Sequence, residues 1–357
     1  MDFHYVSHAN RVIFGQGKIK ETKEELAKLG KKAIVLATPE QKDLANEVAE
    51  IIEELCGFVY TKAVQHVPVE TVINAQAIVE KEKIDVLLAV GGGSSIGLAK
   101  ALALNTSLPI LAIPTTYAGS EMTPVWGLTE NNLKKTGTNM IVKPKTVIYD
   151  SNLTLTLPKG LTVTSGMNAI AHCAEGLYAE NANPIVSLFA EDGVRALASS
   201  LPRILEKPED MEARGEAQYG TMLGGMVLGS VGMALHHKLC HTLGGTFNLP
   251  HAETHTVILP YAIQYNASHI PKAMEALARA LNTTPDDVPG ALYDLSSSLG
   301  SHTSLEALGI KEIELDKAAE IATKNPYYNP RPVNKEGIRE LLQYAFEGKR
   351  PELAYVK

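Results

Sequence analysis

Apolar segments without alternating polar residues place the strongest limit on the fold of this chain. The segments KAIVLAT, DVLLAVGGG and LPILAIPT all lie within the first 150 residues. A strand with apolar side chains on both faces is buried on both, as in a parallel sheet that lies between helices. RVIFG and KTVIYD are shorter strand candidates, and segments of helical period separate the strands (IKETKEELAKLG, EQKDLANEVAEIIEEL, VETVINAQAIVEKEKI and SSIGLAKALAL). This alternation predicts an α/β fold with a parallel sheet.

The pattern changes after KTVIYD, which ends at Asp150. SNLTLTLPKG has the composition of a linker, and beyond it nearly every segment has helical period: about 159–181, 184–204, 211–235, 255–283 with breaks, 288–299, 315–324 and 335–347. No strand signal of comparable strength follows. We therefore predict a Rossmann-like, dinucleotide-binding α/β domain over residues 1–155 and an all-α domain over residues 156–357.

Composition and charge argue against several classes of protein. The 357 residues carry 33 Lys and Arg against 40 Asp and Glu, a net charge of −7. Because no block of Lys or Arg occurs, neither nucleic acid nor an anionic membrane surface is an expected partner. The most apolar segment, TMLGGMVLGSVGMAL, is too short and too rich in Gly to span a membrane, so we interpret it as a deeply buried helix. The three cysteines are scattered and the N-terminus lacks the features of a signal peptide, so we expect a cytoplasmic protein.

A glycine-rich turn joins a predicted strand to a predicted helix in LLAVGGGSSIGLAKA. Gly91, Gly92 and Gly93 allow the backbone to approach a ligand closely, and Ser94 and Ser95 can donate to phosphate oxygens. The free N–H groups and the dipole at a helix start favour an anion. The alternative is a tight turn without a ligand, but the position between a parallel strand and a helix favours phosphate binding.

A second polar turn follows the next predicted strand, in AIPTTYAGSEMTP. It offers the hydroxyl groups of Thr115, Thr116, Ser120 and Thr123. These residues follow the carboxyl end of a strand, where open α/β sheets bind nucleotides. A loop whose hydroxyls bond only to its own backbone is the alternative. Two such loops after adjacent strands favour a shared dinucleotide site.

Histidines gather in the segment ALHHKLCHTLGGTFNLPHAETHTVILP. His237 and His241 are spaced four apart and so share one face of a helix, and His251 follows a Gly-Gly break and a Pro that can turn the chain back toward that face. Histidines clustered in this way favour ligation or catalysis. For His236 and His255 taken individually, a structural role is favoured, because His236 points away from the predicted face and His255 lies beyond the turn.

The segment GMNAIAHCAE, Gly166 to Glu175, has the same spacing. Asn168 and His172 lie four residues apart, on one helical face. Ligands at this spacing usually indicate a metal, but the neutral amide of Asn lacks the charge that a carboxylate brings. The segment is therefore either a metal site or a metal site put to another use.

These motifs together resemble the iron-containing (group III) alcohol dehydrogenases, over nearly the whole chain. In that family a G-G-G-S loop and a P-T-T loop hold the dinucleotide, a G-M-D-A-x-x-H helix gives an Asp and a His to the metal, and H-x-x-x-H followed by P-H gives two more His ligands. The resemblance implies a dehydroquinate-synthase-like fold. It places the four metal positions at Asn168, His172, His237 and His251, with His241 near the nicotinamide and the substrate.

Two residues depart from the family's common pattern. Asn168 stands where the family has its Asp ligand, and Gly97 stands where the G-G-G-S-x-x-D loop ends in Asp. Both departures resemble the maleylacetate reductase branch of the family, as do IPTTYAGSEMTPVWG, GMNAIAHCAEGLYA and NPYYNPRPV. The resemblance implies reduction of the carbon–carbon double bond of maleylacetate to 3-oxoadipate by NADH or NADPH, in the degradation of aromatic compounds.

The chemistry of that reaction bears on the missing carboxylate. Hydride addition β to the ketone of maleylacetate produces an enolate, which is less basic than the alkoxide of an alcohol dehydrogenase and needs less help from a Lewis acid. We therefore expect catalysis by Asn168, His172, His237, His241 and His251 without a tightly bound metal. The four histidines are predicted to donate hydrogen bonds to the dianionic substrate, with His241 or His172 as the acid, and His172, His237 and His251 are the ligands of any metal that binds.

Three further expectations concern the cofactor, the substrate and the assembly. Thr38 and Pro39, followed by Glu40, stand at the end of the second strand, where no carboxylate obviously blocks a 2′-phosphate, so we predict use of both NADH and NADPH. Tyr117 and Arg331 are the candidate substrate residues, Arg331 because guanidinium groups suit carboxylates. The family implies a homodimer, with the N-terminal segment crossing to the sheet of a partner.

Other functions remain as alternatives at this point. A metal-dependent alcohol, glycerol or lactaldehyde dehydrogenase shares the fold, but Asn168 argues against it. A dehydroquinate synthase would need a zinc site with a carboxylate and a Lys/Arg cluster for a phosphate, which the sequence lacks. A protein that binds a dinucleotide or a dicarboxylate without catalysis would have no need of the histidine cluster.

Overall fold

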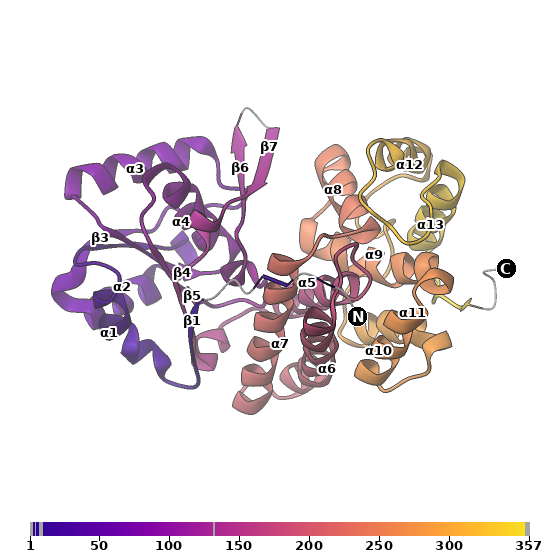
Figure 1. Cartoon of the computed structure of the whole chain (residues 1–357), viewed down its shortest axis with the longest axis horizontal. Helices are drawn as coiled ribbons and strands as arrows, with labels where there is room; N and C mark the ends of the chain where they lie inside the picture. Colours follow the sequence, from indigo (N-terminus) through magenta and orange to yellow (C-terminus); the bar gives the residue numbers. More distant parts are fainter. Residues whose placement is uncertain (1–2, 4, 7–9, 131–132, 354–357) are drawn as a thin grey trace. The chain divides into compact units, whose positions relative to one another are not determined.

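The structure is a computed structural model that describes residues 3, 5–6, 10–130 and 133–353 (Figure 1). The chain packs as two compact units, one of which spans His8–Leu157 while the other contains Pro158–Lys357. Strands of the described residues lie in the first unit, and the second is built from helices. The predicted combination of an α/β region with an all-α region is therefore confirmed. The N-terminal segment that was predicted to reach a partner includes residues 1–2, 4 and 7–9, which lie outside the described residues.

The N-terminal unit is built on a six-stranded parallel sheet in the order β1-β8-β5-β4-β2-β3. The strands are β1 (Arg11–Phe14), β2 (Ala33–Leu36), β3 (Cys56–Tyr60), β4 (Val86–Gly91), β5 (Ile110–Pro114) and β8 (Thr146–Tyr149). The five predicted strands are all present. The edge strand β3 and the antiparallel hairpin of β6 (Val125–Glu130) and β7 (Leu133–Thr138) were not predicted.

Helices cover both faces of this sheet, as the apolar strands require. They are α1 (Thr22–Ala27), α2 (Lys42–Ile52), α3 (Val69–Glu82) and α4 (Gly93–Thr106). Successive strand residues point to opposite faces. Leu87 therefore packs in one cluster with residues of α3 and α4, and Leu88 packs in a second cluster with residues of α1 and α2. The residues that β2, β4 and β5 contribute to these two clusters are fully buried. The sheet therefore holds the ends of these three strands in fixed register.

The C-terminal unit is a set of helices. They are α5 (Lys159–Gly176), α6 (Pro184–Glu206), α7 (Met211–Ser230), α8 (Leu235–Phe247), α9 (His251–Asn266), α10 (Pro271–Leu281), α11 (Val288–Ser298), α12 (Leu315–Thr323) and α13 (Lys335–Glu347). Three predicted boundaries were wrong by four or five residues. The helices expected to continue to residues 181 and 235 end at Gly176 and Ser230. The helix expected from residue 255 begins at His251, directly after Pro250.

The apolar, Gly-rich segment forms the second half of α7, where Thr221, Leu223, Gly224, Gly225 and Val227 are buried. At Gly224 a Cβ atom would lie 3.0 Å from the backbone oxygen of Ala169 in α5. A backbone atom in a packed helix cannot move aside, so only glycine allows α5 and α7 to approach this closely. Since α5 carries Asn168 and His172, this contact helps to hold that helix in place.

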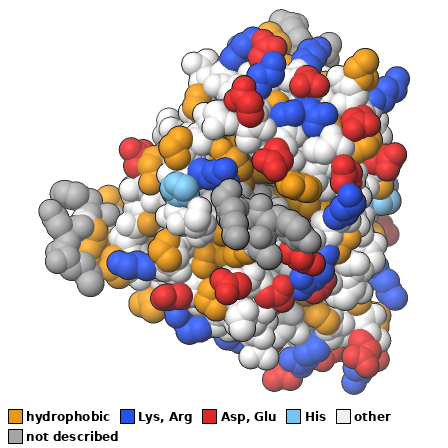
Figure 2. Space-filling model, turned by 90° about the vertical axis from the view of Figure 1, so that its right-hand side faces the viewer, with side chains coloured by type: hydrophobic (Ala, Val, Ile, Leu, Met, Phe, Trp, Pro, Cys, Tyr) orange, Lys and Arg blue, Asp and Glu red, His pale blue; other side chains and the backbone are white. Residues whose placement is uncertain are grey.

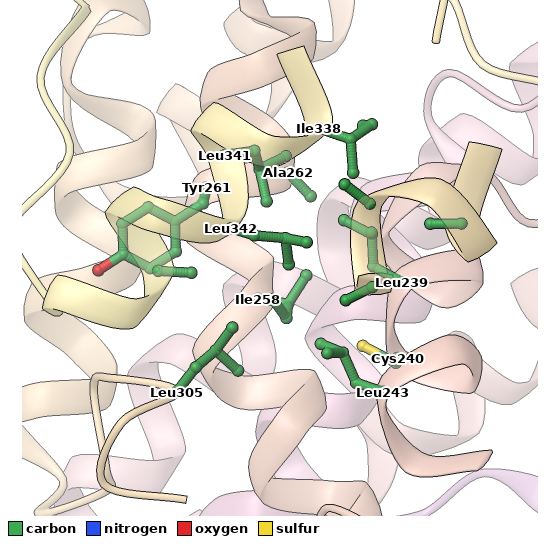
Figure 3. Packing of buried hydrophobic residues seen from close by; sticks show 14 of the residues in the cluster. Leu239, Cys240, Leu243, Ile258, Tyr261, Ala262, Leu305, Ile338, Leu341 and Leu342 are labelled. Carbon is green, nitrogen blue, oxygen red and sulfur yellow. The ribbon is translucent and has the colours of Figure 1, made fainter. Parts of the chain in front are cut away.

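A hydrophobic cluster supports the two helices that carry the other histidines. It joins α8 and α9 to α12 and α13 through Leu239, Leu243, Ile258, Ile338 and Leu342, all of which are buried (Figure 3). Burying side chains of this size stabilises a fold by about 1.5–3 kcal/mol each. One side of α8 and α9 is thus fixed in an apolar core, which leaves their histidine-bearing side to form a site.

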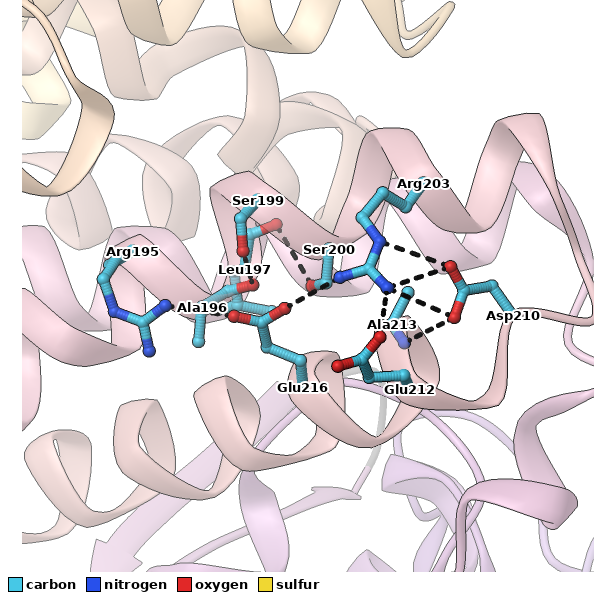
Figure 4. Close-up of polar contacts among 10 residues, drawn as sticks. All are labelled: Arg195, Ala196, Leu197, Ser199, Ser200, Arg203, Asp210, Glu212, Ala213 and Glu216. Carbon is cyan, nitrogen blue, oxygen red and sulfur yellow. Dashed lines mark hydrogen bonds and ion pairs between the residues drawn. The ribbon is translucent and has the colours of Figure 1, made fainter.

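Ion pairs hold α6 against α7 at the surface of this unit. Arg203 of α6 contacts Asp210 at 3.0 Å, Glu212 at 2.9 Å and Glu216 at 3.5 Å, and Arg195 contacts Glu216 at 3.0 Å (Figure 4). The side chain of Asp210 also accepts the N–H of Ala213 and so caps α7. Exposed pairs contribute little individually, but a network with a helix cap contributes more.

Charges of both signs are interspersed on the protein surface that Figure 2 presents. The net charge of the sequence is correspondingly modest, at −7. Among the described helices, none is both long enough and apolar enough to cross a membrane.

Candidate active site

The first part of the candidate site lies at a crevice in the N-terminal sheet. Strands β4 and β2 are neighbours in the sheet. From β2 the chain continues to β3, which lies on the side of β2 away from β4, and from β4 it continues to β5, which lies on the side of β4 away from β2. Adjacent parallel strands whose connections diverge in this way form the crevice in which open α/β sheets bind nucleotides. The glycine-rich turn follows β4 at this point, and a Cβ atom on Gly91 would lie 3.8 Å from Gln41, which follows β2.

The turn itself can be made only by glycine at two positions. Gly91 has φ +131°, which side chains rarely adopt, and a Cβ there would lie 2.7 Å from Ser95 Oγ. A Cβ on Gly92 would lie 2.7 Å from the side chain of Thr116. Helix α4 begins directly afterwards at Gly93, which is exposed. The N–H groups of its first turn are therefore presented as a site for an anion.

The two predicted loops meet at this turn. The N–H of Thr115 donates to the carbonyl of Gly91 at 3.2 Å, and Thr116 packs against Gly92. Ser94 is half-buried, whereas Ser95 Oγ and Thr115 Oγ1 are fully buried and have no hydrogen-bond partner among the described residues. The glycine turn and the exposed start of α4 could hold a dinucleotide phosphate through backbone N–H groups.

Ser120 and Thr123, the other two predicted hydroxyl residues, are engaged by a lysine that the sequence interpretation missed. Lys100 of α4 is fully buried and donates to the carbonyl of Ser120 at 2.6 Å, to Thr123 Oγ1 at 2.9 Å and to the carbonyl of Val125 at 2.8 Å. Burial lowers the pKa of Lys100 to about 7. The three oxygen acceptors favour the charged form instead, because they match the three N–H bonds of an ammonium group. Lys100 thus fixes the second loop to α4.

Tyr117 does not lie where its predicted role requires. Its side chain is completely buried in the N-terminal unit, and its hydroxyl donates to Thr154 Oγ1 at 3.2 Å. A buried ring that is bonded in this way packs the loop against the residues after β8. This environment favours a structural role for Tyr117 over substrate binding.

The second part of the candidate site is the histidine cluster of the C-terminal unit. The ring of His237 lies 5.2 Å from that of His172, 6.2 Å from that of His241 and 4.9 Å from that of His255. The ring of His251 stacks parallel to that of His241 at 6.2 Å. Helices α5, α8 and α9 therefore bring together the four predicted histidines, His172, His237, His241 and His251.

His255 belongs to the cluster, contrary to the interpretation of the sequence. Its ring lies 4.4 Å from that of His251 and 4.9 Å from that of His236. Both of its ring nitrogens are buried, and no hydrogen-bond partner for them lies in the described part of the chain. The misplacement follows from the wrong start of α9, because a helix that begins at His251 puts residue 255 one turn later on the same face. Nε2 of His236 contacts the carbonyl oxygen of His255 at 2.9 Å.

Burial divides the cluster into an interior and an edge. Burial lowers the pKa values of His172, His237 and His255 well below the usual value of histidine, and neighbouring histidines lower them further. Burial, with the neighbouring His237, lowers the pKa of His236 to about 4. These rings are neutral near pH 7. His251 is half-buried and His241 is exposed, so the cluster meets solvent at those two residues.

Glu175 is an acidic residue beside the cluster that the interpretation of the sequence missed. It is completely buried, and its carboxylate lies 2.7 Å from His237 Nδ1. It follows His172 by three residues in α5, so both lie on one helical face. That spacing was visible in the sequence, but the partners of Glu175 lie more than fifty residues away.

The segment from Asn325 to Val333 reaches the cluster through a different residue than predicted. The hydroxyl of Tyr327 lies 3.1 Å from His241 Nδ1. The guanidinium of Arg331 instead donates to the carbonyl of Tyr265 at 3.0 Å and stacks on the Tyr265 ring at 4.2 Å. Tyr265 follows His251 by 14 residues in α9, which corresponds to about 21 Å along the helix at 1.5 Å per residue. The structure therefore does not bring Arg331 to the histidines.

Ligand-type atoms in the cluster could hold a divalent cation. Asn168 Oδ1, His172 Nδ1 and His237 Nε2 are buried and have no partner among the described residues. Among the described residues, the group of three possible ligands with donor atoms within 4.8 Å is His236, His237 and His255 rather than the set that the resemblance implies. The implied set, Asn168, His172, His237 and His251, contains no carboxylate.

Replacing Arg331 by Ala is expected to lower the free energy of unfolding by about 1–3 kcal/mol, since a hydrogen bond and a cation–π contact are lost. The KM for the substrate is expected to stay unchanged. Denaturant unfolding and steady-state kinetics check both statements, with Arg339→Ala, which removes a guanidinium paired with Asp316 on the surface, as the matched control. A rise in KM without loss of stability would return Arg331 to the substrate site.

Comparisons with known proteins cover both parts of the chain. Residues 9–151 match the family model described as iron-containing alcohol dehydrogenase, and residues 162–346 match the model of the C-terminal region of that family. The chain is 52% identical over 351 residues to a maleylacetate reductase of Sphingobium indicum, covering 98% of this chain and 99% of the relative. It is 48% identical over 351 residues to a maleylacetate reductase of a Rhizobium species, covering 98% of this chain and 99% of the relative.

Solved structures are similar over the same length. A crystal structure of maleylacetate reductase from Agrobacterium tumefaciens is 46% identical, with a TM-score of 0.95 over 98% of this chain and 100% of the other. A crystal structure of 1,3-propanediol oxidoreductase, at 24% identity, has a TM-score of 0.91 over 97% of this chain and 100% of the other, which shows a shared fold. By these matches over nearly its whole length, the chain belongs to the iron-containing alcohol dehydrogenase family.

Proposed function

We propose that this protein reduces the carbon–carbon double bond of maleylacetate to 3-oxoadipate, with NADH or NADPH as reductant. The observation that carries the proposal is the identity of about half of all residues, over nearly the full chain, to proteins named maleylacetate reductase. Further support comes from the glycine turn after β4 and from the histidine cluster, since Asn168, one turn before His172 in α5, is an amide where the resemblance implies a carboxylate.

The chemistry requires a proton and a way to stabilise negative charge. The dinucleotide, when bound, supplies a hydride to the carbon β to the ketone, which leaves an enolate. The protein must then deliver a proton to the α carbon and tolerate a substrate with two carboxylates. A carboxylate at position 168 would repel that substrate, whereas the neutral amide of Asn168 can accept or donate a hydrogen bond.

His241 is the best placed proton donor of the cluster. It is exposed, so it can exchange protons with water, and its Nδ1 contacts the hydroxyl of Tyr327. This contact holds the ring in one orientation at the solvent-facing edge of the cluster. His172, the other candidate acid, is buried and its pKa is lowered well below the usual value, so it is a poor proton source near neutral pH. We therefore assign the acid role to His241.

We propose that catalysis needs no tightly bound metal. Any ion that does bind would be held by His172, His237 and His251, where it would supply positive charge beside the enolate oxygen. The support is the uncharged ligand set and the low basicity of an enolate compared with an alkoxide.

The test of the proposed function is oxidation of NADH or NADPH in the presence of freshly generated maleylacetate, with 3-oxoadipate identified as the product. Comparable rates are expected with both nucleotides, because Glu40 is exposed and its carboxylate is engaged by Thr38 and by its own backbone N–H. A preference for NADH beyond about a thousandfold, roughly 4 kcal/mol, would overturn the dual use but not the reaction. Turnover of simple alcohols in place of maleylacetate would favour an alcohol dehydrogenase.

A further inference from the structure

Glu175, near the C-terminal end of α5, ties this helix to the beginning of α8. One of its carboxylate oxygens accepts the N–H of His236 at 2.7 Å. The other accepts the N–H of Ala234 at 2.9 Å and lies 2.7 Å from Nδ1 of His237. The carboxylate thus caps the first turn of α8 and also contacts the ring of His237 on that helix.

These contacts favour the ionised carboxylate. Burial raises the pKa of Glu175, and the charge interaction with His236 and the backbone N–H groups of Ala234, His236 and His237 oppose that shift only in part. Both oxygens already accept a main-chain N–H, which leaves poor geometry for a carboxyl proton. An ionised carboxylate can only accept hydrogen bonds. The proton of the bond to His237 is therefore on the imidazole nitrogen Nδ1.

The other nitrogen of the same ring is then an acceptor. Nε2 of His237 is buried and has no hydrogen-bond partner among the described residues. The His237 ring is stacked with the ring of His172 and lies beside His255. In a neutral imidazole with its proton on Nδ1, Nε2 carries a lone pair.

We propose that Glu175 is a positioning residue, which fixes His237 in the tautomer protonated at Nδ1 and directs the lone pair of Nε2 into the cluster. A group that binds next to Nε2 of His237 must then be a cation or an O–H or N–H donor. A carboxylate or enolate oxygen would meet a lone pair there and be repelled.

One consequence corrects the sequence-based expectation that His237 donates a hydrogen bond to the substrate. With Nδ1–H committed to Glu175, His237 has no proton left to give. The donor role falls to other members of the cluster, of which His241 is the exposed one. This consequence rests on the proposed function, whereas the tautomer of His237 does not.

Nuclear magnetic resonance of the whole protein, labelled with ¹⁵N in its histidines, tests the tautomer directly. The ring signals of His237 are identified by their loss in His237→Asn. In the unmodified protein near pH 7, Nδ1 is expected to show the shift of a protonated nitrogen and Nε2 that of an unprotonated one. A proton on Nε2 would overturn the proposal. This measurement needs no substrate, so its outcome is independent of the proposed reaction.

Glu175→Gln provides the second measurement. Its side-chain oxygen can still accept a main-chain N–H, while its NH₂ group donates toward His237 Nδ1 and should move the ring proton to Nε2. The kcat is expected to fall about 10- to 100-fold, the usual effect of losing an orienting partner of a site histidine, with little change in KM. Glu180→Gln, which alters an exposed carboxylate nearby, is the matched control and should change neither property. A lower melting temperature with an unchanged tautomer would show that Glu175 only caps α8.

Discussion

Replacing His241 by Ala is expected to lower the kcat of maleylacetate reduction by about 10²- to 10⁴-fold, the range typical of a lost general acid. The exposed ring contacts Tyr327 and stacks near His251, but it is not part of the buried hydrophobic cluster behind α8. The free energy of unfolding should therefore change little, and the binding of NADH to the free enzyme should stay the same. Steady-state kinetics, denaturant unfolding and nucleotide titration measure the three quantities.

The surface histidine His269 offers a matched control for this experiment. It is exposed and contacts the neighbouring Ser268, so His269→Ala should leave kcat unchanged. Tyr327→Phe should cause a smaller loss than His241→Ala, since it removes the hydroxyl that orients the imidazole but keeps the acid. If His241→Ala retains most of its activity, the proton comes from another group and the assignment is wrong.

Replacing Gly91 by Ala is expected to raise the KM for NADH and NADPH by about 10- to 100-fold, equivalent to roughly 1.4–2.7 kcal/mol of binding free energy. The new Cβ would lie 2.7 Å from Ser95 Oγ, at a φ of +131° that alanine rarely adopts. Such backbone strain costs on the order of 1–3 kcal/mol, and it would displace the first turn of α4, where the N–H groups are proposed to bind phosphate.

The kcat at saturating nucleotide should be nearly unchanged in this variant, because the histidine cluster belongs to the other unit. Gly215→Ala is the matched control, since a Cβ there meets nothing within 4 Å in the second turn of helix α7. An unchanged KM for both nucleotides in Gly91→Ala would remove the turn after β4 from the cofactor site.

The parts of the fold that were predicted correctly are those with strong periodicity. Strands β2, β4 and β5 are buried on both faces, so their sequences are apolar throughout and easily identified. The hairpin strand β7 has the sequence LKKTGT and is almost entirely exposed. No apolar pattern marks such a strand, because its pairing with β6 supplies backbone hydrogen bonds rather than a buried face.

The members of the histidine cluster could be predicted only where the helix boundaries were predicted correctly. The four-residue spacing correctly paired His237 with His241 on α8. The same rule applied to α9 would have paired His251 with His255, but the helix start was placed four residues too late. Helix termini depend on the local geometry around Pro250, which periodicity does not reveal.

Contacts between distant segments were the least predictable. Glu175 meets the start of α8, and Tyr327 meets His241, across 62 and 86 residues respectively. The segment NPYYNPRPV has no regular period, so the sequence could not distinguish Tyr327, which reaches the cluster, from Arg331, which does not. The charge of Arg331 suggested a carboxylate partner, but its guanidinium bonds to a backbone carbonyl instead.

The most direct test of the whole account is the rate of NADH oxidation with maleylacetate, measured on enzyme that has been freed of metal by a chelator and dialysis. The account predicts rapid formation of 3-oxoadipate at a rate that neither the chelator nor added iron or zinc changes appreciably. Loss of activity on chelation, with recovery on adding a stoichiometric metal, would contradict the metal-independent mechanism. Absence of any turnover of maleylacetate, with or without metal, would contradict the proposed function itself.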